Sequence, residues 1–364
     1  MKIVLVVSHL GAGGSERVLG IMANYWARTG HEVHLITLSP EMNPAFPIAA
    51  EVRRMSAQQT RPPIFGKIGK MAVFRRQLRD LAPEVVVAFG HVTNVITLVA
   101  SKGLGIPVIV SERNNPGRLA IPWPFALGRF LLYPSAAALV TQTQSIDDWF
   151  ARRGYRCRRC IIPNPILEKD DREDGESGPV LSGYSLVTVG SLTRQKGHDR
   201  LLQIFGIIAR QRPEWKLFIV GEGPERPLLE KEIEKQGLQG QVVLLGYQRN
   251  PTAIVKQADM FVFTSYYEGF PNALAEAMAA GVPVISFDCP MGPGELIENG
   301  QNGILIPDGD CDTFAESLLK LMDDPDRRAS LGRQAVVVRQ RFSIKSIMGQ
   351  WEELIHSIRG RSCT

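Results

Sequence analysis

The sequence predicts an α/β protein built from two doubly wound, Rossmann-like domains that face a cleft. Three observations support this fold class. The chain has 364 residues, and single hydrophobic cores usually split beyond roughly 250–300 residues. Its 44% apolar and 22% charged residues are typical of a globular protein. Short apolar runs alternate with helical patterns along the chain, which is typical of parallel-sheet α/β units.

Ten apolar runs, most of them followed by a glycine-containing or polar loop, are predicted to be buried strands. The first series is Ile3–Ser8, Glu32–Thr37, Val85–Phe89, Pro107–Ser111 and Ala138–Thr141. The second series is Ser185–Val189, Trp215–Val220, Gln241–Leu244, Met260–Phe263 and Pro283–Ser286. Because each series alternates with helical patterns, each predicts one doubly wound sheet.

An acidic and then Gly/Ser-rich segment separates the two series and is typical of a linker. Residues 166–182 are therefore the expected linker, with domains at residues 1–165 and 183–342. The tail at about 343–360 keeps its apolar residues on one helical stripe. This helix either returns to the first domain or packs on its own domain.

Charge and cysteine content limit the class of protein. Residues 1–170 carry 21 Lys and Arg against 11 Asp and Glu, whereas the rest carry 21 against 26. A basic half attracts anionic lipid, phosphorylated substrates or nucleic acid, but no nucleic-acid-binding motif accompanies it. Five irregularly spaced cysteines favour a reducing compartment, and Cys157 and Cys160 are interpreted as incidental thiols rather than a metal site.

No apolar run reaches the roughly 18 residues that span a bilayer. The opening run Ile3–Val7 is too short for the apolar core of a signal peptide. We therefore expect a cytoplasmic protein, soluble or peripheral to a membrane.

A glycine loop follows the first predicted strand. Gly11, Gly13 and Gly14 precede a helix that is expected to begin near Ser15 or Glu16. Backbone amides in such a loop can approach a phosphate, although many such loops are only tight turns. The spacing is not G-x-G-x-x-G, which disfavours a dinucleotide-dependent dehydrogenase.

The second predicted sheet begins with a strand that leads into GSLTRQKGHD. Arg194 and Lys196 then lie at the carboxyl end of a parallel strand, which is the edge where doubly wound sheets bind ligands. Lys196 is the preferred phosphate ligand. The alternative is a solvated loop charge.

The segment EGFPNALAE after Met260–Phe263 is the most informative motif. Pro271 suits a first helical turn, so free amides from about Asn272 to Leu274 can face an anion. Glu276 is then on the helix and can accept both hydroxyls of a vicinal diol such as a ribose. Glu268 lies in the loop and can contact a sugar near its reacting carbon. A pair of hydrolase carboxylates stays open, because spacing does not give their separation.

These motifs together resemble retaining glycosyltransferase family 4, which has the GT-B fold. The matching segments occur in the family's order over nearly the whole chain: GGSERV, IIPNPI, GSLTRQKG, VGEGPER, LLGY, EGFPNALAEAMAAGVPVIS and NGILIPDGD. A SER segment like that in SERNNP is found in bacterial lipid-linked-oligosaccharide, O-antigen and capsule transferases of the N-acetylgalactosaminyltransferase type.

The resemblance implies a role for each matching residue. The implied catalytic residues are Glu268, Lys196 and Arg113. The implied donor-binding residues are Glu276, Arg194, Gly190, Phe270, Pro271, Asn272, Ala273, Gly221, Gly223, Tyr247, Gly13 and Gly14. The implied acceptor-side residues are Glu112, Asn114 and Arg17. Two positions depart from the family: Ser191 replaces a common arginine, for which Arg194 is the nearest substitute, and SERNNP replaces a common histidine.

The resemblance also implies an activity. The expected reaction is retaining transfer of a hexose or N-acetylhexosamine from a UDP-sugar, or less often a GDP-sugar, to a glycan acceptor. The implied acceptor is linked to polyprenyl diphosphate, in bacterial surface polysaccharide or glycan assembly. No metal or cofactor is expected. A nucleotide-sugar epimerase with the same fold and a non-catalytic sugar-nucleotide-binding subunit are the alternatives.

A basic and aromatic part of the first domain suggests contact with anionic lipid on the inner face of the cytoplasmic membrane. Its residues are Lys67, Lys70, Arg75, Arg76 and Arg79, the segment from Arg118 to Tyr133, and RRGYRCRR. Alternatively, these charges form a solvated face, and Trp123 and Phe125 belong to the core. His198 is expected to be structural.

Overall fold

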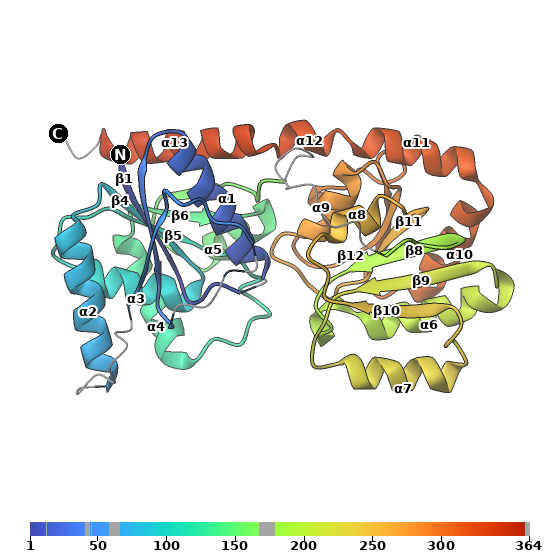
Figure 1. Cartoon of the computed structure of the whole chain (residues 1–364). Coiled ribbons are helices and arrows are strands. Elements are labelled where there is room, and N and C mark those ends of the chain that lie inside the picture. Colours follow the sequence, from blue (N-terminus) through green and yellow to red (C-terminus); the bar gives the residue numbers. More distant parts are fainter. Residues whose placement is uncertain (12, 41–43, 45, 58–65, 167–178, 361–364) are drawn as a thin grey trace. The chain divides into compact units, whose positions relative to one another are not determined.

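The computed structural model describes residues 1–11, 13–40, 44, 46–57, 66–166 and 179–360. It divides into two compact units (Figure 1). The first contains Met1–Pro165 and Ile344–Thr364, and the second contains Ile166–Ser343. The expected linker falls largely on residues 167–178, which lie outside the described residues.

The first unit is a seven-stranded parallel sheet in the order β3-β2-β1-β4-β5-β6-β7. Its strands are β1 Lys2–Val7, β2 Glu32–Thr37, β3 Arg53–Ser56, β4 Val85–Phe89, β5 Val108–Ser111, β6 Ala138–Thr141 and β7 Arg159–Ile161. Its helices are α1 Gly14–Arg28, α2 Gly66–Leu81, α3 His91–Ser101, α4 Trp123–Leu132, α5 Gln144–Arg152 and α13 Ile344–Arg359, with a 3-10 turn η1 at Tyr133–Ser135.

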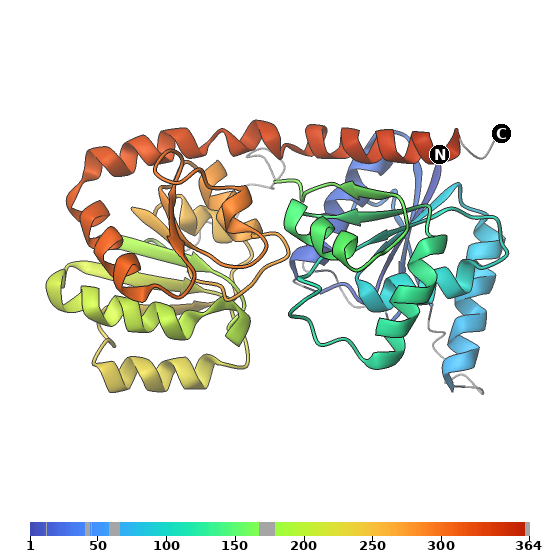
Figure 2. The ribbon, with the colours of Figure 1, turned by 180° about the vertical axis from the view of Figure 1, so that it is seen from behind.

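The C-terminal helix α13 packs on this first unit. Trp351 of α13 is fully buried, with its ring 6.5 Å from Trp26 of α1 and 6.4 Å from Phe89 of β4. At the end of the helix, Arg359 forms an ion pair with Glu84, which precedes β4. The sequence left two alternatives for this helix, packing on the first domain or on the second. The structure shows the first of them, as seen from both sides in Figures 1 and 2.

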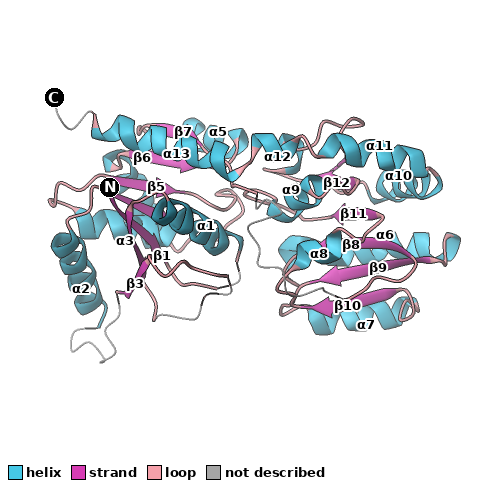
Figure 3. Ribbon diagram, turned by 45° about the horizontal axis from the view of Figure 1, so that its top comes forward, coloured by secondary structure: helices cyan, strands magenta, loops and turns pink. Residues whose placement is uncertain are grey.

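The second unit is a six-stranded parallel sheet in the order β10-β9-β8-β11-β12-β13. Figure 3 labels the strands from β10 to β12 in this order. Its strands are β8 Tyr184–Val189, β9 Trp215–Val220, β10 Val242–Gly246, β11 Met260–Phe263, β12 Val284–Asp288 and β13 Ile304–Pro307. Its helices are α6 His198–Gln211, α7 Arg226–Gln236, α8 Pro251–Val255, α9 Asn272–Ala279, α10 Cys311–Asp323, α11 Pro325–Ala335 and α12 Val338–Arg341, with 3-10 turns η2 Arg194–Lys196 and η3 Pro293–Glu295.

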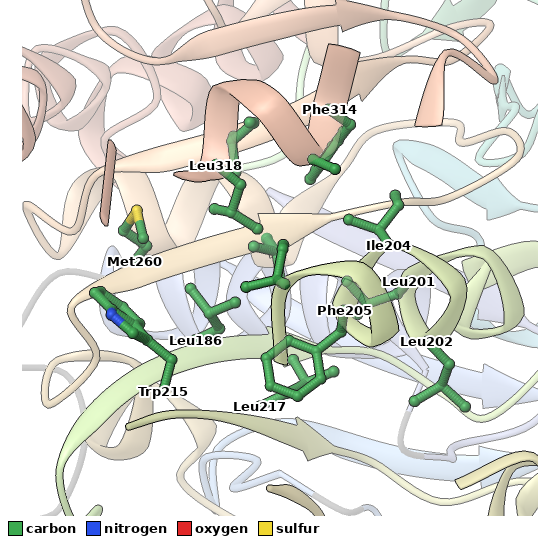
Figure 4. Packing of buried hydrophobic residues seen from close by; sticks show 14 of the residues in the cluster. Leu186, Leu201, Leu202, Ile204, Phe205, Trp215, Leu217, Met260, Phe314 and Leu318 are labelled. Carbon is green, nitrogen blue, oxygen red and sulfur yellow. The ribbon is translucent and has the colours of Figure 1, made fainter. Parts of the chain in front are cut away.

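Helices α6, α7 and α10 bury one face of this second sheet. Phe205 of α6 and Phe314 of α10 are among its fully buried side chains, and Figure 4 shows them with Leu217 of β9 and Leu318 of α10. Each such side chain contributes about 1.5–3 kcal/mol relative to exposure. This core holds the strands in place, and with them the loops at their carboxyl ends.

The ten predicted strands all occur, with ends within two residues of the prediction. Three further strands, β3, β7 and β13, were not predicted, and each lies at an edge of its sheet. The prediction of two parallel, doubly wound sheets is confirmed. Among the described residues, no helix combines the length and the apolar character that a membrane span requires.

Candidate functional site

Lys196 and Glu268 lie side by side in the second unit. Lys196 ends η2 in the loop after β8, and Glu268 lies in the loop after β11. The Lys196 Nζ donates to Glu268 Oε1 at 2.8 Å, and the two side chains are 22% and 5% exposed. Strands β8 and β11 are neighbours although the chain visits β9 and β10 between them. This is the topological switch point of the sheet, where open α/β sheets bind ligands.

The start of α9 differs slightly from the expectation. Pro271 caps the helix instead of lying in its first turn, and the Asn272 amide donates to the Phe270 carbonyl oxygen at 2.9 Å. The backbone amides of Ala273 and Leu274 have no hydrogen-bond partner among the described residues. The amides available to an anion are thus those of Ala273 and Leu274, because the Asn272 amide is already used.

Phe270 precedes α9 in the sequence, and Glu276 lies within the helix. The Phe270 ring is buried and packs at 5.5 Å against Phe342. Glu276 is half-buried on α9, where the Thr252 hydroxyl of α8 donates to its Oε2 at 3.5 Å. The two acids of the motif therefore have different partners, Lys196 for Glu268 and Thr252 for Glu276.

Gly221 and Gly223, which follow β9, are required by close contacts with the backbone of the loop after β8. A Cβ on Gly221 would lie 1.9 Å from the Gly190 carbonyl oxygen, and one on Gly223 would lie 2.4 Å from that of Leu192. A Cβ on Gly190 would press on the Lys196 side chain at 3.2 Å. These residues bring the two loops together and leave room for the lysine stem.

Arg194 and Tyr247, two further residues predicted for the donor site, are both exposed. Arg194 lies at the start of η2, and Tyr247 directly follows β10. His198 is buried with its Nε2 3.3 Å from the Ser191 carbonyl oxygen. Burial lowers the pKa of His198 to about 4, so its imidazole is neutral at neutral pH.

In the first unit, the Glu16 side chain lies against Gly13 of the glycine loop. Gly13 caps α1 and Gly14 begins it. The Glu16 carboxylate folds over this cap, so that a Cβ on Gly13 would lie 2.2 Å from Glu16 Oε2. His9 Nε2 lies 3.8 Å from Glu16 Oε1. Sequence reasoning missed Glu16, although an acid in the first turn suits the helix dipole. Arg17, in the next position, donates its backbone amide to Gly13.

The SERNNP loop after β5 carries two buried ionisable residues, Glu112 and Arg113, and their side chains bind different partners. Glu112 accepts a short hydrogen bond from the Tyr133 hydroxyl and pairs with Arg129 at 3.9 Å. Burial raises the pKa of Glu112, and Arg129 opposes that rise. Tyr133 and Arg129 were not predicted as partners of Glu112. Both belong to the segment from Arg118 to Tyr133 that was predicted to contact anionic lipid, and the structure corrects this for them, because they are only 0% and 5% exposed.

Arg113 is buried without a carboxylate partner among the described residues. Its Nη1 donates to Asn164 Oδ1 at 2.6 Å, and its guanidinium lies 4.1 Å from the Phe89 ring. Its Nε and Nη2 have no hydrogen-bond partner within the described part of the chain. Burial lowers the pKa of Arg113 to about 9. The neighbouring Asn114 is exposed.

The basic and aromatic residues of the first unit divide into internal and exposed groups. Arg75 Nη1 donates to the carbonyl oxygens of Ala100 and Lys102 at the end of α3, so it is used internally. Trp123 is 77% exposed, which corrects the alternative that it belongs to the core. Across the described residues, no group of three or more His, Cys, Asp or Glu side chains could hold a metal ion.

Two family models match this chain. Residues 13–165 match the glycosyl transferase 4-like domain, and residues 170–337 match the glycosyl transferases group 1 domain. The chain is 30% identical over 292 residues to an exopolysaccharide phosphotransferase of Streptomyces coelicolor, a match covering 79% of this chain and 30% of that protein.

A second relative matches end to end. It is the GalNAc-alpha-(1->4)-GalNAc-alpha-(1->3)-diNAcBac-PP-undecaprenol alpha-1,4-N-acetyl-D-galactosaminyltransferase of Campylobacter jejuni, 27% identical over 367 residues and 99% of both chains. Among solved structures, Anabaena HepE in complex with UDP and glucose has a TM-score of 0.80 at 21% identity, covering 98% of this chain and 100% of that chain. That likeness concerns the fold, and the GT-B prediction is confirmed.

Proposed function

The chain belongs to the glycosyltransferases, with a glycosyl transferase 4-like domain followed by a group 1 domain, and from this premise we propose its reaction. It transfers a hexose or N-acetylhexosamine, with retention, from a UDP-sugar to a glycan acceptor linked to polyprenyl diphosphate. The observation that carries the proposal is the Lys196–Glu268 pair at the switch point of the second sheet.

The pair suits a sugar diphosphate. An ammonium has three N–H donors, so Lys196 can keep its hydrogen bond to Glu268 while it donates to a phosphate oxygen. Glu268 then accepts hydrogen bonds from donor-sugar hydroxyls. The free amides of Ala273 and Leu274 at the start of α9 supply further donors for the diphosphate.

We assign the nucleotide to the other acid of the motif. Glu276 accepts the two ribose hydroxyls, and Thr252 beside it orients the carboxylate. Gly221, Gly223 and Tyr247 follow the neighbouring strands β9 and β10, where the base is proposed to bind.

The proposed chemistry needs no protein nucleophile. The bond from the sugar C1 to the diphosphate oxygen breaks, and the acceptor hydroxyl forms a new bond to C1 on the same face. The hydroxyl proton passes to the departing diphosphate, and Lys196 stabilises the negative charge that grows there. Neither a metal nor a cofactor is assigned to this reaction.

The acceptor rests on different support. The Campylobacter relative is named for transfer to a PP-undecaprenol glycan, which supports a lipid-linked acceptor for this chain. In the first unit, Arg113 has a buried positive charge without a carboxylate partner among the described residues, and its Nε and Nη2 have no hydrogen-bond acceptor there. We propose that Arg113 contacts an anionic or hydroxyl group of a substrate, with Glu112, Asn114 and Arg17 on the acceptor side.

We also propose that helix α4 rests on an anionic membrane surface. Its exposed side chains include Trp123 and Leu131, at 77% and 61% exposure, together with Leu127 and Phe130. The Phe130 ring packs at 5.9 Å against Tyr155, which places α4 beside the exposed side chains of Arg152, Arg153 and Arg156. Apolar side chains flanked by arginines are typical of helices that bind anionic lipid surfaces.

Incubation with a UDP-sugar in the absence of acceptor tests this function against its two alternatives. NMR that shows the UDP-sugar unchanged until a polyprenyl-diphosphate glycan is added supports a transferase. Interconversion of the sugar nucleotide without acceptor identifies an epimerase. Tight UDP binding without turnover on any acceptor identifies a non-catalytic binding subunit.

A further inference from the structure

The buried guanidinium of Arg200 connects three segments around the proposed donor site. Arg200 lies in the first turn of α6 and is 6% exposed. Its Nε donates to the Thr264 carbonyl oxygen at 2.5 Å, its Nη2 donates to that of Ser265, and its Nη1 donates to Asp308 Oδ1 at 2.8 Å. The Tyr266 ring lies 4.3 Å from the guanidinium carbon. A planar group with a partner on each nitrogen is held in one orientation.

The two carbonyl groups that Arg200 binds begin the loop that leads to Glu268. Thr264 directly follows β11, and its hydroxyl donates to the Gly197 carbonyl oxygen at 3.0 Å. Gly197 has φ +64°, and a Cβ there would lie 2.0 Å from the Thr264 carbonyl oxygen. Gly197 also directly follows Lys196. The loop that carries Lys196 and the loop that carries Glu268 are therefore in backbone contact at the point where Arg200 binds.

We propose that Arg200 is a positioning residue of the donor site. By fixing the Thr264 and Ser265 carbonyls against the start of α6, it sets the separation of Lys196 and Glu268, and Asp308 holds its guanidinium in register. Its link to donor chemistry rests on the proposed function. A lysine could not replace it, because one ammonium cannot reproduce a planar fork that binds two successive carbonyls and a carboxylate.

The test compares Arg200→Lys with the matched control Arg212→Lys. Arg212 Nε and Nη2 donate to the two oxygens of Asp323 at 3.0 and 2.6 Å in the exposed part of the same unit. The same substitution there removes a fork without touching either loop. Hydrogen exchange of peptides covering residues 264–268 should quicken in Arg200→Lys and stay unchanged in Arg212→Lys.

Kinetics separate positioning from a general loss of structure. Arg200→Lys should lower kcat, measured from the UDP formed during turnover, at least about tenfold, because small displacements of catalytic groups slow the reaction strongly. Its affinity for UDP, measured by calorimetry, should fall less than kcat does, because Lys196 is one of several proposed ligands of UDP, and Glu276 and α9 make no direct contact with Arg200 among the described interactions. Equal losses of kcat and UDP affinity, or a folded variant with unchanged exchange and unchanged kcat, would overturn the proposal.

Asp308→Asn provides a milder variant in case Arg200→Lys does not fold. This variant leaves both carbonyl contacts of Arg200 in place and weakens only the contact of its guanidinium with the side chain at position 308. The same pattern is therefore expected with a smaller fall in kcat, about threefold. Unchanged kcat and exchange in this folded variant would count against the proposal. A wild-type protein that turns over no sugar nucleotide would instead refute the proposed function, while the exchange measurement would still decide whether Arg200 holds the loop.

Discussion

Replacing Lys196 with methionine removes the ammonium and keeps a stem of similar length against Gly190. Glu268, which is 5% exposed, then lacks the cation 2.8 Å away. Breaking a buried ion pair costs about 3–5 kcal/mol, and a hydrogen bond to a charged group contributes about 1.5–3 kcal/mol. Because Lys196 is 22% exposed, water replaces part of the lost contact, and we expect a loss of about 2 kcal/mol in the free energy of unfolding.

The same variant should lose most of its activity. Removing one fixed donor that stabilises transition-state charge costs about 10²–10³ in kcat, so UDP release should fall at least about a hundredfold. The double variant Lys196→Met/Glu268→Gln is the control. It no longer buries an unpaired carboxylate, so it should regain part of the lost stability in urea unfolding but none of the activity. Activity within about threefold of wild type in Lys196→Met, or no regain of stability in the double variant, would refute the reasoning.

Three further predictions concern other parts of the chain. Glu276→Ala should weaken UDP binding about tenfold or more in calorimetry, since it removes hydrogen bonds to a charged acceptor; unchanged affinity would refute the ribose assignment. Leu131→Glu on α4 should reduce pelleting with anionic liposomes, whereas Leu228→Glu on α7, with similar exposure (66% against 61%), should not; equal pelleting of both would exclude α4. His198 has a pKa lowered to about 4 against 6.5 in the unfolded chain, so the unfolded state binds more protons between these values. Stability should therefore fall by about 2 kcal/mol from pH 7 to pH 5, and urea unfolding of His198→Gln should lack that part of the slope.

The strands that the sequence did not predict share a physical cause. Interior strands of a parallel sheet are buried on both faces and read as continuous apolar runs, as Val85–Phe89 does. Edge strands are not bound by this requirement. Accordingly β3 has the sequence RRMS and β7 the sequence RCI. The third, β13, is a short apolar run that ends at Pro307, and in the sequence it is distinguished only as part of the segment NGILIPDGD.

For the candidate site, the sequence predicted positions better than partners. Strand ends placed Lys196 and Glu268 at the ligand-binding edge, but their hydrogen bond depends on β8 lying beside β11, which spacing along the chain does not specify. Arg200 was missed because its partners are 64 and 108 residues away, and in the sequence it resembles an ordinary solvated helix charge. The Glu16 carboxylate over Gly13 was missed for a similar reason, since its side-chain direction is a tertiary feature.

The mass of the product formed from each of a set of UDP- and GDP-sugars, with a polyprenyl-diphosphate glycan as acceptor, tests the transferase assignment most directly. We expect one UDP-sugar to extend the acceptor by the mass of a single hexose or N-acetylhexosamine residue, with one UDP released per product and almost none from Lys196→Met. An acceptor of unchanged mass with every donor, despite UDP binding, would contradict the assignment.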